Sequence, residues 1–317
     1  MKYIIREDTL KRAKAKTKAD LAVRSLLFAV CLISALSVIF IIIFIFIRGM
    51  KPFVTSYDID GEKFRVNMWS FLTGNEWHRG VASYSVGYII LNTIYVAILT
   101  MLLTAPISIF TALVIVRMSN RYFGAVINSV IEILAAIPSV IYGMFGMGVI
   151  TKWAKGFANV FGIQTAGGLS TFSVVMVLTM MSVPTVTMLT VTSLKAVNKN
   201  LVNGSLALGA SRSETNFKVI LPAAKSGIFA GLIMGLSRAL GEATAVTMVA
   251  GNAIAGPNFS IFSTTRTLTS TMLTGLSEAS GLAYDIRFSV GIVLIFIIIG
   301  FNLLLNLVNK RLGRGSR

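Results

Sequence analysis

Long apolar runs alternate with short polar segments over most of the chain. A helix needs about twenty mostly apolar residues to cross the hydrocarbon core of a bilayer. Only helices and closed barrels satisfy their backbone hydrogen bonds there. The pattern therefore predicts an all-α polytopic membrane protein. We expect about six transmembrane helices, over residues 26–47, 84–116, 125–150, 169–194, 225–251 and 288–308.

The polar segments between these runs suggest how the chain is divided. A basic tail (1–24) precedes the first span and an outer loop, which together cover residues 25–82. A core of five spans (83–309) includes a polar hairpin at 195–222, and a second basic tail (310–317) ends the chain. The first span contains no polar residue beyond Ser and Cys, so we expect it to face lipid at the periphery of the bundle.

Proline and hydroxyl residues modify this picture in the later spans. Pro138 lies inside the third span, where it removes a backbone hydrogen bond, and we expect a kinked helix there. Pro184 lies near the centre of the fourth span. We interpret residues 151–168 as a short outer loop. Residues 252–283 are rich in Ser and Thr, and we interpret them as a polar segment that can include a re-entrant piece.

Composition and charge agree with a membrane protein and suggest its orientation. Hydrophobic residues make up 55% of the chain and charged residues only 13%, whereas soluble domains are about a quarter charged. The net charge of +17 comes from Lys and Arg that mostly flank the apolar runs on one side. This positive-inside pattern predicts cytoplasmic termini that touch anionic lipid. No basic stripe is interleaved with aromatic residues, which argues against nucleic-acid binding.

The chain has one cysteine, Cys31, and one histidine, His78. Structural metal sites usually draw on several such residues. We therefore expect no metal site.

Residues 195–222 are too polar to span the bilayer and too apolar for a solvated loop. Apolar residues from Leu201 onward predict a short amphipathic helix that Gly209 can end with a left-handed cap. The run SRSE (211–214) has the pattern of a capping box, which would start a second helix. We expect that helix to stop at Pro222, where the fifth span begins. The residues alone leave two interpretations open: a hairpin lying on the membrane surface, or a docking element for a cytoplasmic protein.

The fifth span carries two charges near its middle, Arg238 and Glu242. A charge at the centre of a spanning helix costs about 3 kcal/mol on insertion scales, and such groups are usually functional. The two residues are four apart, so on a continuous helix they share a face. The alternative is an ion pair whose charges neutralise each other. Small residues recur every four positions and predict a packing ridge on this helix: Gly227, Gly231, Gly235 and Ala239.

Three runs of the sequence resemble permeases of binding-protein-dependent ABC importers. NGSLALGAS (203–211), followed by VILP (219–222), resembles the EAA loop of these permeases. EILAAIPSVIYG (132–143) and SRALGEATAV (237–246) resemble the phosphate permeases of the PstC type. The resemblance implies a type I ABC importer permease fold.

The resemblance also implies that the hairpin contacts an ATPase. Asn-Gly-Ser replaces Glu-Ala-Ala at residues 203–205, so the acidic position of the loop is absent. The residues implied in ATPase coupling are Asn203, Gly204, Ser205, Gly209, Ala210, Ser211, Leu221 and Pro222.

Further partners follow from the same resemblance. They are a second, PstA-like permease, two PstB-like ATPase subunits that bind ATP, and an extracytoplasmic, PstS-like phosphate-binding protein. The chain has no G-x-x-x-x-G-K-[ST] run, so we expect no ATPase site, no cofactor and no enzymatic activity of its own. The implied mechanism is alternating access.

The resemblance makes Arg238 the residue that meets phosphate in the translocation path. A guanidinium is a planar fork that suits an oxyanion, and Glu242 would hold Arg238 in place and weaken its grip. Glu132 and Ser139 are further candidates. Glu132 can instead pair with Arg121 or a partner subunit, and Ser139 can supply a neutral hydrogen bond. The alternatives are a permease for molybdate or sulfate, and a secondary transporter or channel that needs no ATPase.

Overall fold

The computed structural model describes residues 7–59, 61–78 and 83–314, so the predicted basic tails lie partly outside it. Five of the described helices are long and apolar enough to cross a membrane. A bent pair of helices supplies a sixth span if the pair counts as one. The fold is mostly helical, as expected, but two short antiparallel hairpins depart from the all-α prediction.

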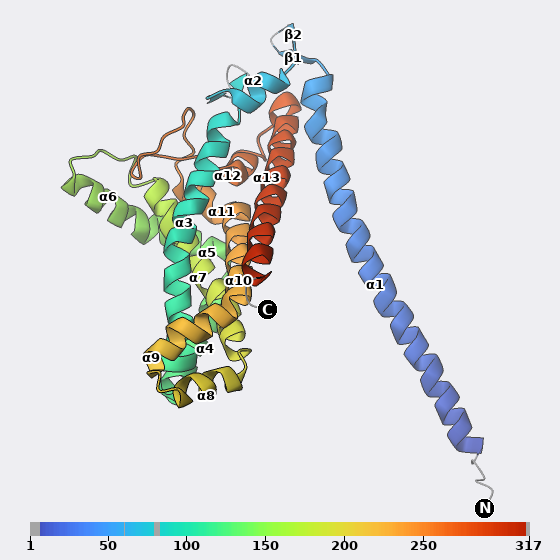
Figure 1. The fold of residues 1–317 in the computed structure, drawn as a ribbon. Coiled ribbons are helices and arrows are strands. Elements are labelled where there is room, and N and C mark those ends of the chain that lie inside the picture. The colour runs from blue at the N-terminus through green and yellow to red at the C-terminus, as the bar shows by residue number, and fades with distance from the viewer. Residues whose placement is uncertain (1–6, 60, 79–82, 315–317) are drawn as a thin grey trace, which may run out of the picture.

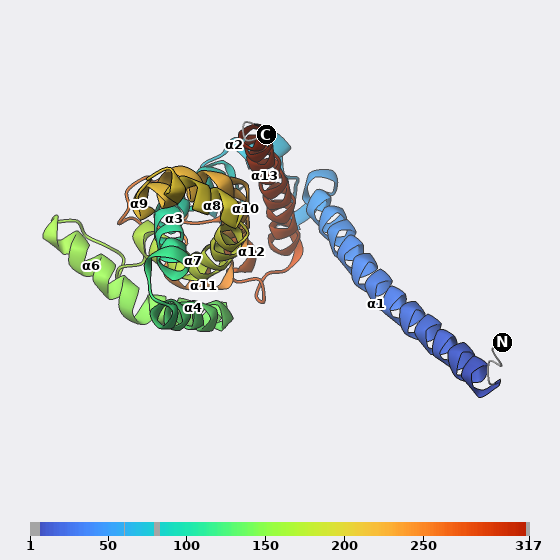
Figure 2. The same ribbon diagram turned by 60° about the horizontal axis from the view of Figure 1, so that its bottom comes forward.

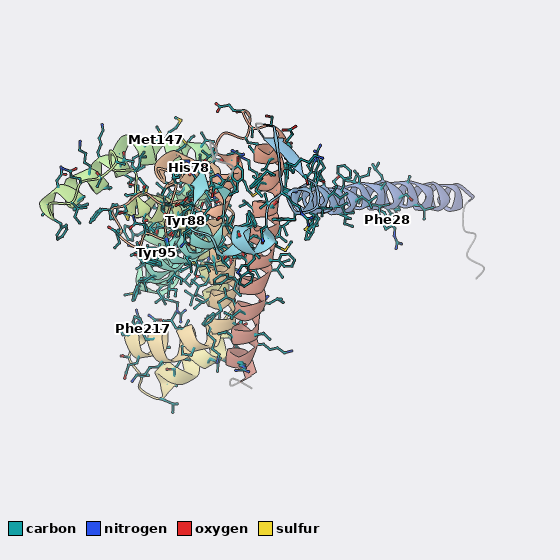
Figure 3. The ribbon with its side chains drawn as sticks, turned by 90° about the horizontal axis from the view of Figure 1, so that it is seen from above. Phe28, His78, Tyr88, Tyr95, Met147 and Phe217 are labelled. Atoms are coloured by element: carbon teal, nitrogen blue, oxygen red, sulfur yellow. The ribbon has the colours of Figure 1, made fainter. Side chains whose placement is uncertain are left out.

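Helix α1 (Glu7–Val54) stands apart from the other helices along most of its length (Figure 1). None of its most apolar 18-residue window is buried. Phe28 lies on this isolated part, well away from the bundle (Figure 3). A first span at the periphery is thereby confirmed, although the helix extends well beyond residues 26–47 and into the basic tail.

A buried carboxylate fastens the C-terminal end of α1 to helix α13 (Gly281–Arg314). The side chain of Asp285 is only 4% exposed. It accepts a hydrogen bond from the Tyr57 hydroxyl at 2.7 Å and pairs with Lys51 at 3.2 Å and Arg48 at 3.4 Å. Burial, and then the neighbouring Asp285, raise the pKa of Tyr57. The sequence analysis did not foresee this cluster.

The segment between α1 and α3 folds into a small layer whose apolar side chains join a core shared with α3 and α13. Its elements are β1 (Tyr57–Ile59), β2 (Glu62–Phe64), α2 (Met68–Thr73), β3 (Trp77–His78) and β4 (Ser83–Tyr84). Strand β1 pairs with β2, and β3 pairs with β4. The indole of Trp77 is 3% exposed and packs edge-on against Tyr84, with ring centroids 5.1 Å apart. The expected outer loop is therefore a folded layer.

The centre of the bundle consists of long helices that pack along one another. They are α3 (Gly87–Leu113), α7 (Thr171–Lys195) and α10 (Leu221–Gly241), with α13 beside α10. Helix α3 continues into a π-helical turn, η1 (Val114–Met118). Pro184 lies within α7 without ending it. Helix α7 is the most buried of the candidate spans, because 67% of its most apolar window is buried.

The expected third span is broken rather than kinked. Helix α4 (Arg121–Ala136) and the helical run that begins with α5 (Ser139–Phe145) meet at an angle of 95°. The cause is Pro138, which has no N–H and disfavours helical geometry in the residue before it. That residue, Ile137, has an extended backbone with ψ of 127°.

The run after this break continues through a π-helical turn, η2 (Gly146–Ile150), into α6 (Thr151–Val160). The prediction of a loop at 151–168 is therefore wrong over its first half. Helix α6 projects from the bundle on the side away from α1 (Figure 2).

The expected fifth span is also broken. Helix α10 ends at Gly241, and Glu242 has an extended backbone (φ −73°, ψ 117°) before the short helix α11 (Thr244–Val249). The prediction of one helix over residues 225–251 is wrong for this reason. The break divides the predicted pair, because Arg238 remains in α10 and Glu242 does not.

The polar segment 252–283 folds back onto the helices. The hydroxyl of Tyr88 on α3 donates to the carbonyls of Ala253 and Ile254, and Tyr95 donates to that of Phe259. The segment contains one short helix, α12 (Leu268–Leu273), whose first four residues are buried. The segment thus returns into the bundle, as the sequence allowed.

Candidate transport site and coupling hairpin

Arg238 lies in the last turn of α10, half-buried and directed toward α7. Its Nη1 donates a hydrogen bond to Oγ1 of Thr185 at 2.7 Å. Thr185 directly follows Pro184. The hydroxyl of Tyr142 on α5 is within electrostatic range of the guanidinium. The guanidinium is therefore directed at a neighbouring helix, which is the arrangement expected of an intramembrane charge that faces protein rather than lipid.

The small residues of α10 let it approach α7 closely. A Cβ on Gly227 would collide with Ser193, and one on Gly235 would collide with Val186. A Cβ on Gly231 would lie 3.2 Å from the Cβ of Leu189. The ridge therefore faces α7, and Ala239 is buried in line with it. This packing sets the distance between Arg238 and Thr185.

Glu242 occupies the break between α10 and α11 and does not form an ion pair with Arg238, although both residues are described. Its Oε1 accepts the backbone N–H of Ala245 at 3.1 Å, near the start of α11. Its carbonyl accepts the hydroxyl of Thr269 at 2.8 Å. The predicted i, i+4 pair is wrong because the helix ends between the two residues. Glu242 instead stabilises the geometry of the break.

Glu132 and Ser139 lie on either side of the other break. Glu132 is exposed on α4, where its Oε1 accepts a hydrogen bond from Nδ2 of Asn128 at 2.6 Å. The pairing of Glu132 with Arg121, one of the alternatives that the sequence left open, is absent, and both residues are described. Ser139 is the first residue of α5. The structure gives neither candidate a hydrogen bond to Arg238.

The segments that follow the two breaks pack directly on each other. A Cβ on Gly143 of α5 would lie 2.6 Å from Sδ of Met248 and 3.0 Å from Cα of Ala245, both in α11. The Tyr142 hydroxyl donates to the carbonyl of Leu134 at 2.8 Å, which bridges the first break. The two breaks are thus structurally linked. Arg238 lies at the edge of this region.

The predicted helix–turn–helix at 195–222 is present. Helix α8 (Lys199–Ala207) ends with Gly209 in the left-handed region, at φ of 86°. The N–H of Gly209 donates to Leu206, and the N–H of Ala210 donates to Ser205. This pair of bonds is the Schellman motif, which satisfies the free carbonyls of a helix end.

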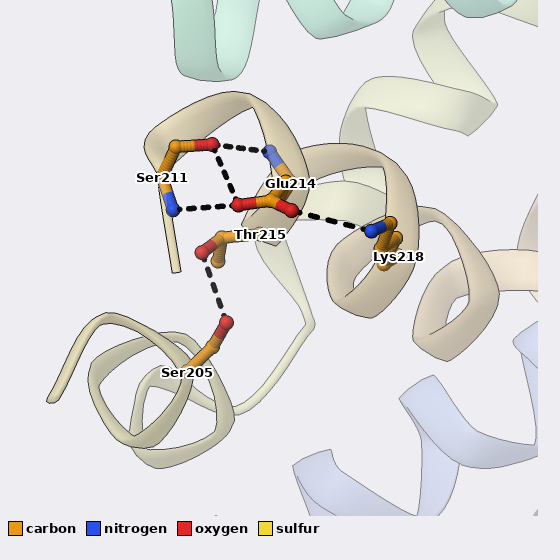
Figure 4. Close-up of polar contacts among 5 residues, drawn as sticks. All are labelled: Ser205, Ser211, Glu214, Thr215 and Lys218. Carbon is orange, nitrogen blue, oxygen red and sulfur yellow. Dashed lines mark hydrogen bonds and ion pairs between the residues drawn. The ribbon is translucent and has the colours of Figure 1, made fainter. Parts of the chain in front are cut away.

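The predicted capping box is confirmed (Figure 4). Ser211 Oγ accepts the N–H of Glu214 at 3.2 Å, and the Glu214 carboxylate accepts the N–H of Ser211 at 3.1 Å. The Ser211 N–H, and then Lys218, hold the pKa of the Glu214 carboxyl below its usual value. The hydroxyls of Ser205 and Thr215 lie 2.9 Å apart and join the two arms of the hairpin.

The second arm of the hairpin does not stop at Pro222, contrary to the prediction. Helix α9 (Arg212–Glu214), the π-helical stretch η3 (Thr215–Ile220) and α10 follow one another without interruption. The N–H of Leu221 donates to the carbonyl of Asn216, five residues back. A π-helical stretch of this kind accommodates a proline that has no N–H to donate. Pro222 therefore sits within a continuous helix.

The hairpin exposes apolar side chains, as expected. Leu208 is 90% exposed, Leu201 53% and Phe217 46%. Figure 3 shows Phe217 on this hairpin, away from Tyr88 and Tyr95 in the N-terminal part of α3. The other residues implied in coupling lie in the same hairpin or at its junction with α10: Asn203, Gly204, Ser205, Ala210, Ser211, Leu221 and Pro222.

Sequence reasoning missed Thr185 and Tyr142 as neighbours of Arg238. A threonine directly after a proline in a span was the available signal for Thr185. Hydroxyl residues are common in helix contacts, so that signal does not single out one of them. Tyr142 lies within the run EILAAIPSVIYG, but its position relative to Arg238 depends on the break at Pro138.

Residues 104–317 match the family described as "Binding-protein-dependent transport system inner membrane component". The chain is 32% identical over 292 residues to the probable ABC transporter permease protein YqgH of Bacillus subtilis, covering 91% of this chain and 90% of that protein. It is 32% identical over 244 residues to the phosphate transport system permease protein PstC of Pasteurella multocida, covering 72% of this chain and 76% of that protein.

Solved structures show a similar fold at low sequence identity. One is a bacterial alginate ABC transporter in complex with a periplasmic protein, with a TM-score of 0.64 and 15% identity over 94% of this chain and 96% of that chain. Another is a bacterial ABC transporter involved in the import of alginate, with a TM-score of 0.62 and 16% identity over 93% of this chain and 99% of that chain.

Proposed function

We propose that phosphate is the substrate of this chain, which belongs to the family of binding-protein-dependent transport system inner membrane components. The chain is a multi-pass permease subunit of an ABC importer, with the type I fold expected from the sequence. It is not itself the ATPase, and ATP is bound by its ATPase partners. The observation that supports phosphate as the substrate is the similarity to phosphate permeases, at about 30% identity.

The chemistry of Arg238 supports an anionic substrate. A guanidinium presents several N–H donors in one plane and can bind two oxygens of an oxyanion at once. One nitrogen is engaged by Thr185, which leaves other donors for a substrate. Glu242 forms no ion pair with Arg238, and its carboxylate accepts a hydrogen bond at the start of α11 instead. Arg238 is therefore suited to meet phosphate as it passes the two breaks.

The hairpin supports coupling to ATPase subunits. Its turn is fixed by the Schellman motif and the capping box, while Leu208 is almost fully exposed and Phe217 about half exposed. We place an ATPase on this surface, with both termini of the permease on the same, cytoplasmic side. A second, PstA-like permease would complete the path. PstB-like ATPases would drive it, and a PstS-like binding protein would deliver phosphate from outside.

Phosphate uptake by the assembled importer tests this proposal. Arg238→Gln removes the charge and should abolish uptake while the ATPase still co-purifies with the permease. Arg311→Gln is the matched control, because Arg311 is exposed near the end of α13, and it should transport normally. Normal uptake by Arg238→Gln would refute a role for Arg238 in the path.

Competition by unlabelled anions tests the substrate itself. Excess phosphate should suppress the uptake of labelled phosphate, whereas excess sulfate or molybdate should not. The opposite result would identify the chain as a permease for another tetrahedral oxyanion. Uptake that needs no ATPase subunit would contradict the coupling assigned to the hairpin.

A further inference from the structure

The guanidinium of Arg238 is held from the neighbouring helix by a single hydroxyl. We propose that Thr185 is a positioning residue for transport, which fixes the orientation of Arg238 so that its remaining donors meet the passing oxyanion. The inference rests on the proposed function, because it assumes that Arg238 lies in the path. It assigns to Thr185 the role that the sequence suggested for Glu242.

The contact has the geometry of a strong hydrogen bond. Nη1 of Arg238 and Oγ1 of Thr185 are 2.7 Å apart, which is short for a nitrogen donor and typical of a bond assisted by charge. Among the described residues this is the one hydrogen bond that the Arg238 side chain makes. An arginine has several rotatable bonds, so a single anchor strongly restricts where its donors point.

The alternative anchor, Glu242, is committed elsewhere. Its Oε1 accepts the N–H of Ala245 and its carbonyl accepts the Thr269 hydroxyl. It forms no ion pair with Arg238, and both residues lie in the described part of the chain. A hydroxyl partner differs from a carboxylate in one important respect: it orients the guanidinium without cancelling its charge. Arg238 is thus held by a neutral partner and not by a direct ion pair.

The backbone around Thr185 is well placed to act as a fixed support. Pro184 restricts the backbone directly before it, and the next side chain, Val186, is fully buried against α10. Gly235, three residues before Arg238, packs on that same valine. The donor and the acceptor are therefore each anchored within one turn of a tight helix contact. The backbones that carry the donor and the acceptor are therefore held in register by the packing of α7 on α10.

Uptake by the full importer, measured per assembled complex, tests this role. Thr185→Val keeps the shape of the side chain and removes the acceptor, whereas Thr185→Ser keeps the acceptor. Thr187→Val is the matched control, because the Thr187 hydroxyl is buried in the same helix and has no hydrogen-bond partner among the described residues. Assembly is followed by co-purification of the ATPase. Uptake is measured over a range of phosphate concentrations.

The maximal rate of Thr185→Val should fall roughly tenfold or more, as expected for loss of a hydrogen bond to a charged group. The KM should change little, because delivery by the binding protein is untouched. Thr185→Ser should restore most of the rate, and Thr187→Val should match the wild type. A defect confined to packing would instead lower assembly and leave the rate per complex unchanged.

Three results separate this inference from the proposed function. Normal transport by Thr185→Val together with no transport by Arg238→Gln would overturn the positioning role and leave phosphate transport intact. Normal phosphate transport by Arg238→Gln would overturn the positioning role together with the role of Arg238 in the path, whereas absence of phosphate uptake by the wild-type importer would overturn the proposed substrate. If Thr185→Val assembles poorly, the rate per complex of Thr185→Ser is the deciding measurement. Thr185→Ser keeps the acceptor, so a rate per complex as low as that of Thr185→Val would also overturn the role.

Discussion

Gly235→Ala tests whether the close packing of α10 on α7 controls the transport site. The added Cβ would overlap Cγ2 of Val186. Carbon atoms pack at about 3.5–4.0 Å, so we expect the helices to separate locally by on the order of 1 Å. Arg238 lies one turn further along α10. Its bond to Thr185, now 2.7 Å, would then exceed the length of a hydrogen bond.

The expected loss of stability is small, because two effects oppose each other. Overpacking a tight contact costs about 1–3 kcal/mol. Replacing glycine by alanine within a helix contributes about 1 kcal/mol of favourable propensity. The net cost should be about 0–2 kcal/mol, which leaves the complex assembled. The separation of Arg238 from Thr185 should nevertheless lower uptake about tenfold, as for loss of a hydrogen bond to a charge.

The assay is phosphate uptake per complex, together with thermal unfolding in detergent. Gly300→Ala is the matched control, since a Cβ there meets no atom within 4 Å, and it should transport normally. The double variant Gly235→Ala, Val186→Ala removes the overlapping methyl group and should recover part of the uptake. Full uptake by Gly235→Ala alone would refute the link between this packing and the site.

Two further substitutions test the anchor of α1 and the cap of the hairpin. Asp285→Ala removes the acceptor of Tyr57 and two partly exposed ion pairs, so we expect a loss of about 2 kcal/mol in thermal unfolding and a smaller loss for Asp285→Asn. Unchanged unfolding of Asp285→Ala would contradict this reasoning. Ser211→Ala should destabilise the hairpin by about 1 kcal/mol, seen as faster limited proteolysis, with Ser213→Ala as the neutral control. Because the pKa of Glu214 is lowered in the fold, its contribution should be complete at neutral pH and disappear only as the pH falls through that lowered pKa. Proteolysis of Ser211→Ala at the wild-type rate would contradict the role of the cap.

The features that the sequence predicts well are those that depend on local rules. A bilayer demands long apolar helices, and hydropathy therefore locates the spans. The hairpin depends on Gly209 and on the Ser211–Glu214 spacing, both of which act within a few residues. A left-handed glycine and a capping box require no knowledge of the rest of the fold.

The features that the sequence does not predict depend on how separate segments meet. Pro138 predicts a bend, but the angle of 95° requires α5 to find its contact on α11 through Gly143. At Glu242 no proline marks the end of α10, and Gly241 alone does not distinguish this position from the other glycines of the helix. That break is stabilised by the Glu242 side chain on Ala245 and by Thr269 from a distant segment. Thr185 follows a proline, but only its proximity to Arg238 in the fold gives that position a role.

The continuity of the helix at Pro222 changes how movement of the hairpin can reach the site. Residues 212–241 form one uninterrupted helix of 30 residues, about 45 Å long at 1.5 Å per residue. Its first turn is the capped start of the second hairpin arm, and its last turn carries Arg238. A joint at Pro222 would absorb a displacement of the hairpin, whereas a continuous helix transmits it. An ATPase that moves the hairpin would therefore slide or rotate Arg238 against Thr185 on α7. Because a bond of 2.7 Å breaks with a shift of about 1 Å, a small movement at the hairpin is enough to release the guanidinium and change what it can bind.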